Sequence, residues 1–211
     1  CALENENKFS FYSLYTKIIM KYLFANWKMY LDYEESVALA LAIATESKDI
    51  AEHIKMAIFP SSMALAAVAE KVKPAGIAVG AQNAHWVEKG GYTGEVSMPM
   101  YKAAGCEYAL VGHSERRHLF GETNHQVRQK VEAALAADLT PVICVGETGA
   151  ERQGSKTEEV IEAQIRSAFH NIVWPESKKL SLPMNQCGQL VQASLATHWK
   201  PSACMKLSKN R

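Results

Sequence analysis

The sequence predicts an α/β fold with a parallel sheet. Short apolar runs of strand length alternate with longer amphipathic runs of helical spacing, and five such pairs follow one another between residues 20 and 172. Parallel neighbours need crossover connections, which are nearly always right-handed. A doubly wound sheet and a (β/α)₈ barrel both meet these conditions, and both collect functional side chains at the carboxyl ends of their strands.

The five strands are predicted from the apolar runs themselves. They cover residues 22–27, 54–60, 77–83, 107–112 and 140–147. A long loop follows the third strand, and its glycines allow tight backbone turns. A short helix at residues 98–104 then leads into the fourth strand.

Capping residues predict where the first two long helices begin. Asp32 with Glu35 has the spacing of a capping box, and it opens a helix with apolar positions at Val37, Leu41 and Ala44. The second helix is expected to start at a serine cap, to reach Val72 and to stop at a proline and a glycine. The residues in question are Ser61 or Ser62 for the cap, and Pro74 and Gly76 for the stop.

The last two helices are predicted in the same way. Thr123 or Asn124 caps the first of them, and Ser155 with Glu158 has capping-box spacing before the second. The apolar positions are Val127, Val131, Ala134 and Leu135 in the first helix, and Ile161, Ile165 and Ala168 in the second.

The composition excludes several classes of function. The net charge is +1, so nothing favours nucleic acid or an acidic membrane surface as a partner. No apolar run approaches the ~18 residues of a membrane span. The five cysteines and seven histidines lack ligand or disulfide spacing, so we expect free thiols in a reducing compartment and no metal. No G-x-G-x-x-G motif follows the first strand, which disfavours a dinucleotide cofactor.

The two ends of the chain do not continue the pattern. Residues 1–19 lack clean periodicity and the apolar core of a signal peptide, and Met20 is a natural beginning, so we expect 1–19 to be a non-native extension. After about Ile172 the chain has a single acidic residue, Glu176, and no convincing helix face or parallel-strand run. We expect one domain at residues 20–172 and an aberrant tail at 173–211.

Polar side chains at strand ends are the candidates for chemistry. Asn26 and Lys28 end the first strand, where a lysine can bind an anion and an asparagine can donate a hydrogen bond beside it; a plain surface lysine is the alternative. His113 follows the fourth strand and opens a helix, whose dipole favours a neutral imidazole that can donate to a substrate oxygen. A hydrogen-bonded structural histidine is the alternative.

Other charged residues near these positions have structural readings. Glu115, Arg116 and Arg117 either lock the loop through ion pairs or form a solvated helix start. Glu147 ends the fifth strand and is a candidate base by location, although such glutamates usually pair with an arginine.

Four segments together resemble the triosephosphate isomerase family. They are "ANWKM", "VGAQNAHWVEKGGYTGEVS", "EYALVGHSERRHLFGET" and "PVICVGET", and the match runs over about residues 20–172. The resemblance implies a (β/α)₈ barrel, incomplete here with about five βα units. It also implies a cytoplasmic homodimer formed through the loop Gly90–Glu95. The implied activity, in glycolysis and gluconeogenesis, is cofactor-free interconversion of dihydroxyacetone phosphate and D-glyceraldehyde 3-phosphate.

The resemblance also assigns roles at the site. Lys28 is implied to bind the anionic substrate and to act electrostatically, with Asn26 as its hydrogen-bonding neighbour. His113 is implied to be the electrophile that polarises the carbonyl, working beside a glutamate base as is established for this family. The residues implied to support the site without reacting are Arg117, Cys144 and Glu147.

The catalytic base is absent from the printed reading frame. In the family it follows the sixth strand, in "AYEPVWAIGTGK", a motif that does not occur here. Residues 182–194 can be back-translated and regrouped so that each codon takes the last base of one codon and the first two of the next. The Met184–Asn185 junction then forces a glutamate codon, and every other junction permits the motif residue. We therefore expect the chain after about Ile172 to be out of frame.

Three functional readings follow. The first is an isomerase of this family. The second is a catalytically inactive fragment that at most binds sugar phosphate, because the base, the lid and the phosphate loops are absent in this frame. Five strands cannot close an eight-strand barrel, so this reading predicts marginal folding, aggregation and no turnover. The third, a cofactor-dependent doubly wound enzyme, is disfavoured by the missing glycine motif.

Overall fold

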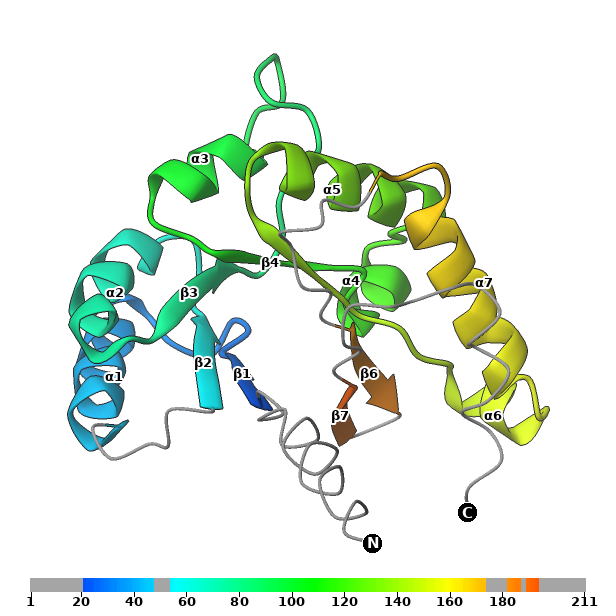
Figure 1. The fold of residues 1–211 in the computed structure, drawn as a ribbon, viewed down its shortest axis with the longest axis horizontal. Coiled ribbons are helices and arrows are strands. Elements are labelled where there is room, and N and C mark those ends of the chain that lie inside the picture. The colour runs from blue at the N-terminus through cyan, green and yellow to red at the C-terminus, as the bar shows by residue number, and fades with distance from the viewer. Residues whose placement is uncertain (1–20, 48–53, 174–181, 187–188, 194–211) are drawn as a thin grey trace, which may run out of the picture.

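The computed structural model describes residues 21–47, 54–173, 182–186 and 189–193. Its centre is a parallel sheet in which the strands follow one another in chain order (Figure 1). The strands are β1 (Lys21–Asn26), β2 (Ile54–Phe59), β3 (Ala78–Ala81), β4 (Tyr108–Val111) and β5 (Thr140–Ile143). A doubly wound sheet reverses its strand order at a switch point, whereas this sheet does not. The fold is therefore a curled, partial (β/α)₈ barrel, and all five predicted strands are confirmed.

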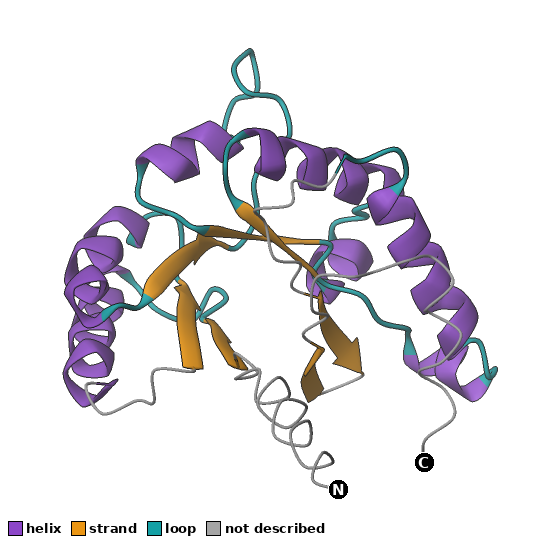
Figure 2. Cartoon of the chain, in the orientation of Figure 1, coloured by secondary structure: helices purple, strands orange, loops and turns teal. Residues whose placement is uncertain are grey.

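The longer helices cover the convex side of the sheet (Figure 2). The longer ones are α1 (Tyr33–Glu46), α2 (Leu65–Val72), α5 (Asn124–Ala136) and α7 (Thr157–Phe169). The shorter ones are η2 (Lys73–Ala75), α3 (Met98–Ala103), α4 (Ser114–Leu119) and α6 (Gly149–Gln153). None of the helices in the described ranges combines the length and the apolar character that a bilayer crossing requires.

The second halves of β2 to β5 are buried on both faces of the sheet, which explains the continuous apolar runs of these strands. In β2, Ile58 packs with the helix-side core, while its neighbours Ala57 and Phe59 belong to a second cluster on the concave side. The same alternation occurs in β4, where Leu110 lies on the concave side and Val111 faces the helices. Strand residues with alternating side-chain directions thus build two cores at once.

Two of the predicted helix caps are confirmed. Asp32 accepts from the backbone N–H of Glu35 at 2.9 Å, and the Glu35 carboxylate accepts from the N–H of Asp32 at 3.0 Å. At α5 the cap is Thr123, with Gln126 completing the box. The alternative cap, Asn124, is already the first helical residue.

Two other caps were predicted wrongly. Neither Ser61 nor Ser62 caps α2, because the chain first makes a turn, and the helix starts after Ala64 without a side-chain cap. The capping box at Ser155 is also wrong. Ser155 has φ +57° and closes the turn between α6 and α7. The N-cap of α7 is therefore Lys156. In both places the conformation of the turn decides the helix start.

The core-facing stripe of α1 is shifted from the predicted apolar positions. Ser36 and Ala40 are fully buried, whereas Leu41 is 55% exposed. Small residues line the buried stripe where α1 packs against α2. The apolar character of Leu41 therefore predicted the wrong side.

The strand–helix alternation stops after α7. Residues beyond it form an antiparallel hairpin of β6 (Leu182–Gln186) and β7 (Gln189–Ala193), which is not hydrogen-bonded to the five-stranded sheet. The sequence did not predict this hairpin. The expected extension 1–19 and much of the expected tail, 173–211, lie outside the described residues.

Candidate functional site

The loop after β1 is held in an unusual conformation that presents Lys28. Lys28 has φ +53°, a region that costs energy for any residue with a Cβ. The backbone N–H of Lys28 donates to Oδ1 of Asn26 at 2.9 Å. From β3, the amide of Gln82 donates to the carbonyls of Lys28 and Phe59, both at 2.8 Å. These bonds tie the ends of three strands together and hold the strained residue in place.

The structure brings Lys28 and His113 to the same mouth of the barrel through Glu115. The Lys28 ammonium lies 2.9 Å from one oxygen of the Glu115 carboxylate, and Nδ1 of His113 lies 3.5 Å from the other. The Lys28 side chain is about two-fifths exposed, and its ammonium is held by Glu115. Glu115, expected to act either in an ion pair or as a solvated residue, forms the ion pair.

The surroundings of His113 favour a neutral ring, and one hydrogen bond selects its tautomer. Its Nδ1 accepts from the backbone N–H of Glu115 at 3.3 Å, so the ring proton resides on Nε2. Burial is the largest cause that lowers the pKa of His113. The Glu115 carboxylate opposes this effect, and the charge of Lys28 adds to it. The sequence argument gave the same direction but assigned it to the dipole of α4, a helix of only six residues.

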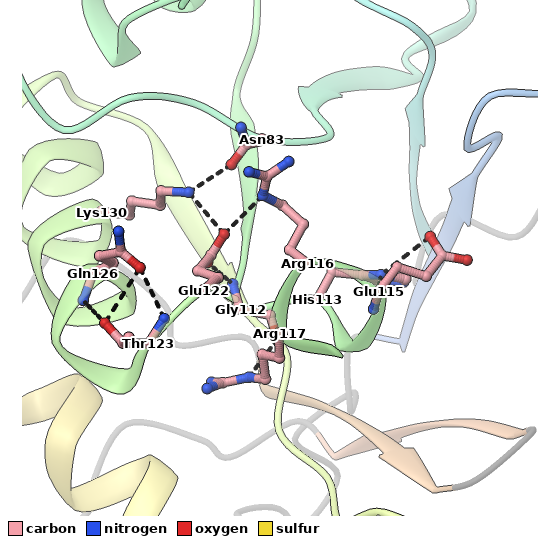
Figure 3. A network of polar contacts seen from close by, with 10 residues as sticks. All are labelled: Asn83, Gly112, His113, Glu115, Arg116, Arg117, Glu122, Thr123, Gln126 and Lys130. Carbon is pink, nitrogen blue, oxygen red and sulfur yellow. Dashed lines mark hydrogen bonds and ion pairs between the residues drawn. The ribbon is translucent and has the colours of Figure 1, made fainter. Parts of the chain in front are cut away.

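A buried ion cluster lies behind His113, and the sequence reasoning missed it (Figure 3). The Glu122 carboxylate, 3% exposed, accepts from Lys130 at 2.8 Å and from Arg116 at 2.7 Å. Lys130 also donates to Asn83 at the end of β3, at 2.7 Å. Lys130 lies on α5, three residues after Val127 and one before Val131, and this position in the sequence could have indicated the buried cluster. A lysine on the apolar face of a helix requires a buried partner.

The cations decide the protonation state of Glu122. Burial alone would raise the pKa of this carboxyl. The hydrogen bond and charge of Lys130, with the Arg116 and Gly112 donors, outweigh burial and lower the pKa below its ordinary value. Glu122 is therefore an ionised acceptor.

Arg117 supports the same region from the other side. Its Nε donates to the carbonyl of Gly112 at 2.7 Å, and its terminal nitrogens reach Asn124 at 2.6 Å and the carbonyl of Cys144 at 3.4 Å. Burial raises the pKa of the Cys144 thiol to about 12, so this cysteine is a packed, protonated side chain.

Glu147 is paired with an arginine, which is the structural alternative that the sequence analysis gave for it. Its buried carboxylate accepts from Arg152 at 2.8 Å and from Thr157 at 3.4 Å. Burial would raise the pKa of Glu147, but its hydrogen bonds and the charge of Arg152 lower it. A carboxylate held by a cation in this way is a poor general base at neutral pH.

The loop after β3 projects from the top of the molecule in Figure 1. His85 stacks on Trp86 with ring centroids 4.2 Å apart and contacts Tyr92 at 4.4 Å. A cavity of about 360 Å³ lies between this loop and Arg116, Glu122 and Lys130, and it is not lined by Lys28 or His113. Among the residues with described placement, no group of three His, Cys, Asp or Glu side chains could hold a metal ion.

Comparisons with known proteins agree with this geometry. The family model described as triosephosphate isomerase matches residues 21–182. Proteins named triosephosphate isomerase from Herpetosiphon aurantiacus and Endomicrobium trichonymphae are 40% and 41% identical over 147 residues, which is 70% of this chain and 58% of each relative. One from Chlorobium luteolum is 41% identical over 152 residues, 72% of this chain and 61% of the relative. The chain thus spans about three fifths of the length of these curated relatives. The chain belongs to the triosephosphate isomerase family.

Proposed function

We propose that this chain carries half of the active site of an isomerase that interconverts dihydroxyacetone phosphate and D-glyceraldehyde 3-phosphate through an enediolate. The observation that carries the proposal is the convergence of Lys28 and His113 on Glu115, which places an ammonium group and a neutral imidazole at one mouth. The names of the relatives support the reaction. Proton transfer next to a carbonyl needs a base and an electrophile, and it needs no cofactor.

In this proposal, three described side chains have separate roles. Lys28 attracts the anionic substrate and stabilises negative charge that develops on it. Asn26 uses Oδ1 to hold Lys28, so we assign its amide nitrogen to the substrate. His113 donates from Nε2 to the carbonyl oxygen. When a proton leaves the neighbouring carbon, the electron pair moves onto that oxygen, and this donor stabilises the resulting oxyanion.

The base must come from outside these residues. Three carboxylates in and around the site, Glu115, Glu122 and Glu147, are each paired with a cation. We therefore assign the base to the glutamate that the shifted frame encodes across the Met184 and Asn185 codons. In this proposal residues 1–19 are an extension, 20–172 the family domain and 173–211 an out-of-frame tail.

The nucleotide sequence around the codon of Ile172 tests the assignment, together with expression of both frames. The frame-restored chain is expected to turn over dihydroxyacetone phosphate, and the printed chain is expected to have no measurable turnover. Codons that do not spell the motif after a one-base shift would contradict the assignment, and so would normal turnover by the printed chain.

For the chain in the printed frame, a second function is favoured by the same ion pairs. Because none of these three carboxylates is free to act as a base, this chain is expected to bind a triose phosphate without converting it. Calorimetric titration with dihydroxyacetone phosphate, run beside a coupled activity assay, separates binding from turnover.

The partner is a second copy of the chain, as the resemblance implies, with the cytoplasm as the place of action. Support comes from the projecting loop Gly90–Glu95, where Tyr92 is 46% exposed. Light scattering on the frame-restored chain and on a variant with this loop shortened to two glycines is the test. A dimer is expected for the first and a monomer for the second, and dimers from both would contradict the proposed interface.

A further inference from the structure

The backbone N–H and the backbone carbonyl of Gly112 are both held by side chains. The Gly112 N–H donates to Oε1 of Glu122 at 3.0 Å, and the Gly112 carbonyl accepts from Arg117 Nε at 2.7 Å. Gly112 has φ +71°, and a Cβ there would meet Arg117, Val127 and the carbonyl of Cys144 at 2.7–3.1 Å. Two hydrogen bonds and close packing therefore restrain the backbone immediately before His113.

The orientation of the His113 ring depends on this backbone. Its own described hydrogen bond is the one from the Glu115 N–H to Nδ1, which fixes the tautomer. The direction in which Nε2 points follows from where Gly112 places the main chain of His113. Glu122 is anchored in turn by Lys130 and Arg116, and Lys130 donates to Asn83, which lies just after β3.

The geometry points to Glu122 as a positioning residue for His113, acting through the Gly112 N–H. This inference rests on the proposed function of His113 as the donor to the carbonyl. Glu122 uses its two oxygens differently: Oε1 holds the Gly112 peptide, and Oε2 accepts from the two cations. A merely structural ion pair would need only the second of these contacts.

Two substitutions separate positioning from stability. Glu122→Gln offers one acceptor oxygen and one NH₂ donor, so either Gly112 or the cations must face a donor. Lys130→Met removes one buried cation but leaves Oε1 facing Gly112 and leaves Arg116 as a partner. Both variants are expected to unfold at lower urea concentration, because both break the buried cluster.

The readouts are the exchange rate of the Gly112 amide hydrogen and the infrared carbonyl stretch of bound dihydroxyacetone phosphate. A donor on the carbonyl oxygen lowers the stretching frequency. In the frame-restored chain, Glu122→Gln is expected to speed Gly112 exchange at least tenfold and to return the stretch toward its value for the free compound. Lys130→Met is expected to keep the shifted stretch and to change the exchange less than twofold.

Equal effects of the two variants on both readouts would overturn the inference, as would an unchanged stretch in Glu122→Gln. If no form of the chain binds dihydroxyacetone phosphate, the proposed function fails by itself. The ring nitrogen resonances of His113 then decide the inference without ligand. Unchanged resonances in Glu122→Gln would overturn it, and resonances changed there but not in Lys130→Met would support it.

Discussion

At the scale of single residues, the site combines strain with charge. Lys28 keeps a left-handed backbone that costs energy. Its N–H donates to Asn26, its carbonyl accepts from Gln82, and Gln82 also donates to the neighbouring Phe59 carbonyl. His113 is kept neutral by burial while it lies close to both a carboxylate and an ammonium group. Lys28 supplies a positive charge, and His113 supplies an uncharged hydrogen-bond donor.

Replacing Lys28 by Met tests the charge. The affinity for glycerol 3-phosphate is expected to fall about tenfold, or ~1.4 kcal/mol, because the ammonium is lost while the length of the side chain is nearly kept. Isothermal titration calorimetry measures the change. Lys102→Met is the matched control, since Lys102 is ion-paired and equally exposed but lies on α3 beside Asp138. Equal losses in the two variants would show that the effect is non-specific.

The pH dependence of stability tests the buried ring. The pKa of His113 is lower in the folded chain than in the unfolded chain, where a histidine titrates at about pH 6.5. Between the lower folded pKa and about pH 6.5, the unfolded state therefore holds more protons, and acidification favours unfolding. The free energy of unfolding of wild type, from urea titrations at pH 7.5 and 5.5, is expected to fall more than that of His113→Gln. A parallel fall in both would contradict a lowered pKa.

At the scale of elements, the turn from β4 into α4 sets the position of the histidine. Gly112 and Gly121 flank this segment with nearly the same φ, +71° and +68°. Gly121 has no atoms within 4 Å of a built Cβ, whereas Gly112 has three close contacts. The two glycines therefore separate backbone strain from crowding.

Alanine at these two glycines gives a matched comparison. Gly121→Ala is expected to cost about 1 kcal/mol of unfolding free energy, from the left-handed backbone alone. Gly112→Ala adds overpacking against Arg117, Val127 and Cys144, so about 3 kcal/mol is expected. Chemical denaturation measures both values. A Gly112→Ala cost no larger than that of Gly121→Ala would mean that the turn is not crowded.

The elements also show what the sequence could and could not predict. Buried parallel strands consist of continuous apolar runs, so all five were predictable, and the caps at Asp32 and Thr123 were predictable because a capping bond is local. The failed caps at Ser61 and Ser155 depend on turn conformations that side-chain type does not reveal. At the site, Lys28 and His113 were found at strand ends. Glu122 was not, because its partners Gly112, Arg116 and Lys130 belong to different elements, and only the packing of α4 and α5 at the end of β4 brings them together.

At the scale of the whole molecule, the described sheet has two open edges. β1 pairs only with β2, and β5 pairs only with β4, among the residues that the structure places. On β1, Leu23 is 53% exposed. Unpaired edges with apolar side chains are templates for association between chains.

The printed chain is therefore expected to form large, polydisperse species at micromolar concentration. The frame-restored chain is expected to form a discrete one, because the added strands cover the edges. Sedimentation velocity at several concentrations measures the distributions. A printed chain that sediments as one small species over this range would contradict the role assigned to the open edges.

The most direct test of the site as a whole is the protonation of His113 in the frame-restored chain at neutral pH. Nitrogen-15 NMR of histidine-labelled protein, assigned with His113→Gln, distinguishes the two ring nitrogens. The expected result is a neutral ring with its proton on Nε2 and an unprotonated, hydrogen-bonded Nδ1. A doubly protonated ring, or a proton on Nδ1, would remove the donor on which the proposed chemistry depends.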